Sequence, residues 1–111
     1  MIISYQNKYL REYCSLLGSG DLNSPFSTIQ TKSIRAVVED LRASPKLTDC
    51  PIQFKRLDDS TIEIELGSIK IICDIISSLE NPKNNEIERL KIIEILNIDL
   101  QQDLRQQNNN L

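Results

Sequence analysis

The chain has 111 residues, of which 40% are hydrophobic and 26% are charged, and its formal net charge is −3. This length suits one domain, and the composition is that of a folded protein rather than a disordered one. A free-standing nucleic-acid-binding domain usually carries a basic excess, because much of its affinity comes from neutralising phosphates. The overall charge lacks that signature, so any contact with RNA would need a local basic patch.

The residue types that most often bind metals are scarce. Histidine is absent, which removes the commonest general base and the commonest metal ligand. The three cysteines, Cys14, Cys50 and Cys73, are widely spaced and form no C-x-x-C pair. We therefore expect no disulfide framework, no metal site and no cofactor, and we expect the thiols to pack as small apolar groups in a reducing cytoplasm.

The first residues, MIISYQNKYLREYC, become charged within eight positions, which is unlike a signal peptide. The apolar runs elsewhere in the chain are far too short to cross a bilayer. We therefore expect a cytoplasmic protein that makes no contact with a membrane.

The first half of the chain predicts one short strand and two helices. Residues 1–5 are typical of a strand, and residues 7–18 of a helix that stops at its final glycine. A second helix is expected to begin at Ser27, since Ser27 and Gln30 fit the capping-box pattern, and to end before Pro45. Its apolar stripe consists of Ile34, Val37, Val38 and Leu41.

The hydrophobic period changes from that of a helix to that of a strand at Pro51. Residues 51–57 and 61–66 alternate, and the second of these segments predicts an antiparallel strand with one face in water. Residues 69–76 form the β-branched run expected of a central strand. Residues 89–98 fit either a helix or a strand, and their isoleucines, together with the Asn/Pro cluster before them, favour a strand.

The predicted order is therefore β-α-α-β-β-β-β, an α+β fold with two N-terminal helices packed on a mostly antiparallel sheet. Residues 1–100 would form this single domain, and residues 101–111 a polar C-terminal tail. The stretch LRASPKLTDCP, residues 41–51, joins helix to sheet. Its two prolines would lower the conformational entropy of the unfolded link, and Leu47 would pin it to the core.

Three short motifs follow one another in the order seen in a known family. N-K-x-L follows the first strand, LRAS-x-x-L-x-D-x-P closes the second helix, and IIEI lies in the last strand; the matching residues are Asn7, Lys8, Leu10, Leu41, Arg42, Ala43, Leu47, Asp49, Pro51, Ile92, Ile93, Glu94 and Ile95. Over residues 1–99 the chain resembles the RelE/HigB superfamily of toxin–antitoxin toxins, especially the branch called plasmid maintenance system killer proteins.

The resemblance implies a RelE-like fold and a cytoplasmic toxin that cleaves messenger RNA, usually on the ribosome. It also implies a cognate antitoxin, for which we expect a helix-turn-helix protein. Cleavage of this type uses the 2′-hydroxyl of the RNA as the nucleophile. It needs a group that accepts that proton, cations that hold the phosphate and an acid for the leaving 5′-oxygen.

The chain departs from the family pattern where this chemistry is expected. Asp58 and Asp59 stand in LDDS, where the family has the basic segment LKGD. Lys70 matches the strand arginine of the family. It keeps the positive charge but cannot donate the two parallel hydrogen bonds of a guanidinium group. The positions of the family's C-terminal Tyr and His are Ile98 and Asp99. The sequence therefore assigns no general acid or base.

Three basic residues, Lys55, Arg56 and Lys70, are the candidates for holding and neutralising the scissile phosphate. Each has a structural alternative. Lys55 and Arg56 should point to opposite faces of one strand, and either could simply face solvent. Lys70 lies in an apolar strand, where an unpaired charge is costly, so it could instead pair with Asp74 on the same strand.

Two hypotheses remain open from the sequence. The first is an mRNA endoribonuclease toxin silenced by its antitoxin. The second is a catalytically inactive member of the fold that acts only by binding protein, which the acidic balance and the missing His and Tyr favour. Glu63 and Glu65 are interpreted here as the solvated face of a hairpin rather than as catalytic carboxylates.

Overall fold

The computed structural model describes residues 1–15 and 25–98. Within these residues the chain has the predicted β-α-α-β-β-β-β order; the elements are β1 (Ile2–Tyr5), α1 (Lys8–Cys14), α2 (Thr28–Ala43), β2 (Phe54–Arg56), β3 (Thr61–Leu66), β4 (Ile69–Ile75) and β5 (Arg89–Asn97), with short 3-10 helices η1 (Leu47–Asp49) and η2 (Asn84–Glu86). The protein is thus α+β, and the choice of a strand for residues 89–98 is confirmed. Gly18, Asp99 and the expected tail 101–111 lie outside the described residues.

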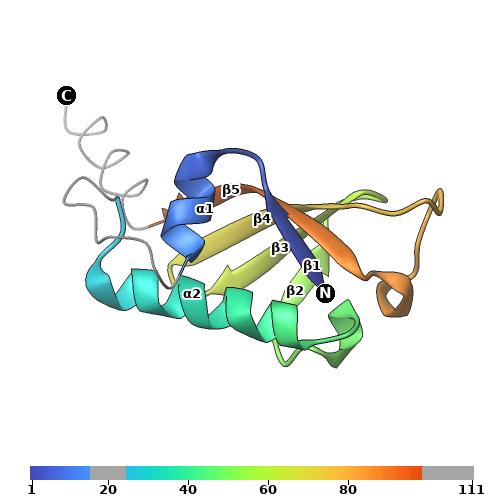
Figure 1. Cartoon of the computed structure of the whole chain (residues 1–111), viewed down its shortest axis with the longest axis horizontal. Helices are drawn as coiled ribbons and strands as arrows, with labels where there is room; N and C mark the ends of the chain where they lie inside the picture. Colours follow the sequence, from blue (N-terminus) through green and yellow to red (C-terminus); the bar gives the residue numbers. More distant parts are fainter. Residues whose placement is uncertain (16–24, 99–111) are drawn as a thin grey trace.

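The strands form one five-stranded sheet in the order β1-β5-β4-β3-β2 (Figure 1). β1 pairs with β5 in parallel, and every other neighbouring pair is antiparallel, so the sheet is mostly antiparallel as predicted. Gly67 and Ser68 form the tight turn between β3 and β4. Gly67 has a φ of +59°, a left-handed conformation that glycine adopts without strain.

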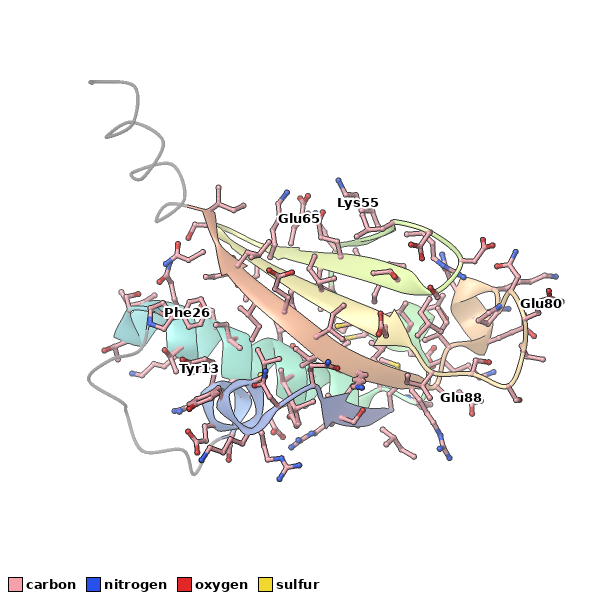
Figure 2. The ribbon with its side chains drawn as sticks, turned by 90° about the horizontal axis from the view of Figure 1, so that it is seen from above. Tyr13, Phe26, Lys55, Glu65, Glu80 and Glu88 are labelled. Carbon is pink, nitrogen blue, oxygen red and sulfur yellow. The ribbon has the colours of Figure 1, made fainter. Side chains whose placement is uncertain are left out.

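Both α-helices lie on the same side of the sheet (Figures 1 and 2). α2 begins with the predicted capping box, because the Ser27 hydroxyl accepts from the N–H of Gln30 and the Gln30 side chain accepts from the N–H of Ser27. α1 is shorter than predicted, since Ser15 already takes an extended conformation and its N–H closes the last turn on Glu12. The buried helix residues are Leu10, Cys14, Ile34, Val37, Val38 and Leu41.

The link between α2 and the sheet is anchored as the sequence suggested. Leu47 is fully buried at the start of η1. Its N–H donates to the carbonyl of Ile87, which precedes β5, at 3.0 Å. The amino group of Met1 donates to the carbonyls of Leu41 and Arg42, both at 3.1 Å, so the C-terminal end of α2 is also tied to β1.

No helix within residues 1–15 and 25–98 is both long enough and apolar enough to span a membrane.

Candidate functional site

The sheet face opposite the two helices carries most of the charged strand residues. On β3, Ile62 and Ile64 are fully buried, and the residues between and after them face the other way. In Figure 2, Lys55 and Glu65 project from this second face, whereas Tyr13 and Phe26 lie in the helix layer. We call the face opposite the helices the open face.

Glu63 lies at the centre of the open face with a lysine on each side. Its Oε2 is 3.3 Å from Nζ of Lys55 on β2, and its Oε1 is 3.5 Å from Nζ of Lys70 on β4. The Glu63 side chain is only 9% exposed, compared with 59% for Lys55 and 31% for Lys70. We refer to these three residues as the Lys–Glu–Lys cluster.

The strand register explains this arrangement. Glu63 stands directly opposite Lys55 on β2 and opposite Ile72 on β4. Lys70 stands opposite Glu65, so it reaches Glu63 diagonally, a distance that a long side chain spans. The aliphatic stems of two lysines and the side chain of Ile72 therefore surround the carboxylate, which explains its burial.

Two expectations from the sequence are corrected here. The Glu63 side chain lies on the predicted face but is not solvated, because its neighbours on both adjoining strands cover it. Lys70 forms its ion pair with Glu63 and not with Asp74, since residues four apart on a strand are separated by roughly 13 Å. Glu65 is exposed, as predicted.

One buried oxygen of the cluster has no hydrogen-bond donor among the described residues. Glu63 Oε2 is buried, and none of the described residues donates a hydrogen bond to it; the contact with Lys55 Nζ brings opposite charges together without hydrogen-bond geometry. Buried carboxylate oxygens are normally satisfied. Oε2 therefore has an unused acceptor lone pair, which an outside donor such as a hydroxyl group reaches only when the lysine side chains around it move aside.

Arg56 lies apart from this cluster. It is opposite Ile62, a core residue, so its side chain belongs to the other face of the sheet. The guanidinium group donates to the carbonyls of Asp58, Asp59 and Pro82 and to the side chains of Asn81 and Asn84. These contacts tie the β2–β3 turn to the β4–β5 connection, so phosphate binding by Arg56 would require some of them to be broken.

The acidic turn at Asp58 and Asp59 is distant from Lys70. The turn adjoins Thr61, which pairs with Asp74, whereas Lys70 pairs with Glu65 at the other end of the hairpin. Four residues along a strand correspond to roughly 13 Å. The carboxylate of Asp58 accepts from the N–H of Ser60 at 2.8 Å, a bond that contributes most to lowering the pKa of Asp58.

No group of three or more potential metal ligands occurs in the described parts of the chain. Comparison with known proteins gave no matching family model, no matching curated protein and no matching solved structure. The sequence indicated both lysines of the cluster as candidate site residues but not Glu63. The two-residue turn between β3 and β4 fixes the pairing of these strands, and this pairing could have shown that Glu63 lies near Lys70.

Proposed function

We propose that this chain is a RelE/HigB-like toxin of a type II toxin–antitoxin system, that it cleaves messenger RNA, and that a cognate antitoxin protein silences it. The motif resemblance supports the family. The observation that carries the chemistry is the Lys–Glu–Lys cluster on the open face, where the described helices leave room for an extended RNA strand.

Each member of the cluster has a role in this proposal. Binding of RNA draws the exposed side chain of Lys55 away from Glu63 and uncovers the Oε2 atom. Oε2 then accepts the proton of the RNA 2′-hydroxyl, and the 2′-oxygen attacks the adjacent phosphorus. The P–O5′ bond breaks, leaving a 2′,3′-cyclic phosphate, and the 5′-oxygen takes a proton. Lys70 and Lys55 neutralise the charge that develops on the phosphate oxygens, and a lysine ammonium group is the nearest proton source. Lys70 is the better placed, because it is the less exposed of the two.

The test is expression of the chain in a bacterial host. We expect growth arrest and cleavage of messenger RNA, either alone or on added ribosomes. Lys70→Ala should relieve the arrest and reduce cleavage by about 10²-fold or more, the usual effect of removing one charge-stabilising group. Lys32→Ala, on the exposed surface of α2, is the matched control and should remain toxic. Circular dichroism would verify that both variants are folded.

A second function is favoured by a specific observation. Each lysine of the cluster is already paired with Glu63, and the chain as a whole is acidic, so the open face holds little uncompensated positive charge for RNA. A catalytically inactive member of the fold that acts only as a protein-binding module fits this balance. It predicts a harmless parent protein and no RNA cleavage with or without ribosomes.

A further inference from the structure

Among the described residues, the strand β1 forms one edge of the sheet, with β5 as its single neighbouring strand. The N–H of Ile2 donates to the carbonyl of Glu88 at 3.1 Å, and the N–H of Gln6 donates to Ile92 at 2.9 Å. In a parallel pair, alternate residues direct their main-chain groups toward the partner strand. The main-chain groups of Ile3 and Tyr5 consequently point outward from the sheet.

Natural edge strands are usually protected by charged residues, by proline or by a bulge. Residues 2–5, IISY, contain neither a charge nor a proline, and Ile2 is 58% exposed. No register shift interrupts the pairing of β1 with β5. This edge is therefore suited to pairing with an added strand.

A cleft of about 450 Å³ lies beside this edge and is basic. It is lined by Ile3, Ser4, Tyr5, Arg11, Ser15 and Arg42, so β1, α1 and α2 all contribute to it. The two arginines come from different helices and converge on the same space. Two guanidinium groups that share a cleft are suited to binding a carboxylate, because each can donate two parallel hydrogen bonds.

The two arginines differ in how far they are already engaged. Arg42 donates to the hydroxyl of Tyr5 at 2.6 Å and pairs with Glu39 at 3.4 Å. Arg11 forms no ion pair with any described residue. The hydroxyl of Tyr5, which accepts from Arg42, still has a proton to donate; burial raises its pKa and keeps that proton in place at neutral pH. An incoming carboxylate would thus meet the guanidinium group of Arg11, the guanidinium group of Arg42, which it would share with Glu39, and the hydroxyl group of Tyr5 as a donor.

We propose that the outer edge of β1 binds an extended segment of a partner protein, and that an Asp or Glu side chain of this segment enters the cleft between Arg11 and Arg42. The added strand hydrogen-bonds to the main chain of Ile3 and Tyr5. Its alternate side chains face the helix layer, and the acidic one among them reaches the cleft. A second copy of this chain fits less well, since neither edge strand, IISY or FKR, contains an acid. The inference does not depend on catalysis by the open face.

The test begins with selection of twelve-residue peptides displayed on phage against the full chain. We expect enriched sequences with β-branched residues around one Asp or Glu. The best peptide is then synthesised in its acidic form and with the corresponding amide residue, and the dissociation constants are measured by calorimetry. Arg11→Gln should weaken binding of the acidic peptide roughly tenfold and leave binding of the amide peptide unchanged. Lys32→Gln, which removes the same charge elsewhere, should have no effect on either.

Amide hydrogen exchange locates the bound peptide. Exchange at Ile3 and Tyr5 should slow when the acidic peptide binds, and exchange at β2, the other edge strand, should not. Arg42→Gln should weaken binding as well. Because this change also removes the contact with Tyr5, its effect cannot be assigned to the lost positive charge alone. The proposal is overturned if the enriched peptides are not acidic, if Arg11→Gln affects both peptides equally, if protection maps away from β1, or if the chain pairs with itself through this edge.

Discussion

Glu63 Oε1 lies 3.5 Å from Nζ of Lys70 on the neighbouring strand, and the Glu63 side chain is almost completely buried while the Lys70 side chain is partly exposed. The two partners therefore differ in what their removal would cost. Loss of a lysine leaves a buried negative charge with less compensation, whereas loss of the glutamate leaves lysines that can extend into water.

The first prediction concerns the stability of this pair. Lys70→Met should lower the free energy of unfolding by about 1–3 kcal/mol, because Glu63 then retains only its contact with the more exposed Lys55. Lys55→Met should cost less than about 1 kcal/mol, the range of exposed pairs. Urea titrations monitored by circular dichroism would measure both.

A double-mutant cycle separates the pair from other effects. In the background of Glu63→Gln, Lys70→Met should become nearly neutral, because no buried charge remains to be compensated. Equal losses from Lys70→Met in both backgrounds would show that the ion pair does not contribute to stability.

The alternation of TIEIEL correctly predicted which residues of β3 enter the core, since Ile62 and Ile64 are fully buried. The same alternation gave the wrong environment for Glu63. Periodicity reports which face a side chain occupies, whereas burial on that face depends on the side chains of the adjoining strands. Lys55 and Lys70 come from two different strands, and their convergence depends on the register of both hairpins.

The second prediction concerns the link between α2 and the sheet. Leu47→Ala should lower the free energy of unfolding by roughly 2–4 kcal/mol, because it removes a fully buried side chain between the helix and the strands. Thr48→Ala, at the neighbouring exposed position, should change it by less than about 0.5 kcal/mol. Similar values for both variants would mean that Leu47 does not pin the link.

The prolines of the link give a separate prediction. Exchange of Pro45 and Pro51 together for Ala should lower the stability by about 1 kcal/mol or somewhat more, chiefly because the unfolded link gains conformational freedom. Both prolines are exposed, so little packing is lost. The denaturant midpoint should fall while the slope stays constant, and an unchanged midpoint would show that the prolines do not stiffen the link.

Arg56 was predicted as a phosphate contact, and its hydrogen bonds indicate a further, structural role that the sequence does not reveal. Besides two carbonyls of the neighbouring turn, its acceptors are the carbonyl of Pro82 and the side chains of Asn81 and Asn84, which lie 25 to 28 residues away in the chain. Such acceptors leave no recognisable pattern in the sequence, because every residue type has a main-chain carbonyl. Only the folded course of the β4–β5 connection brings them to the guanidinium group.

The cysteines give a prediction about pH. Burial raises the pKa of Cys14 and of Cys73 to about 12, against about 8.5 in an unfolded chain. Between these values the unfolded state loses the thiol protons and the folded state keeps them, so stability is complete below pH 8.5 and falls as the pH rises. Each thiol can contribute up to about 1.4 kcal/mol per pH unit. Urea titrations from pH 8 to 10 should show a shallower decline for Cys14→Ala or Cys73→Ala than for the parent.

The last prediction tests whether the open face is catalytic. If Glu63 accepts the proton of the 2′-hydroxyl, Glu63→Gln should reduce the rate of RNA cleavage by about 10²–10⁴-fold, the contribution typical of a positioned general base. The same change removes a negative charge from between Lys55 and Lys70, so the affinity for RNA should increase and not decrease. Glu65→Gln removes the same charge from the same strand and the same face, at an exposed position two residues away, and should leave the cleavage rate nearly unchanged. Tighter binding combined with slower cleavage, seen only for Glu63→Gln, is not expected of a residue that merely supports the fold. If Glu63→Gln lowered both the affinity and the rate, or if the two variants had equal effects, Glu63 would not be the general base.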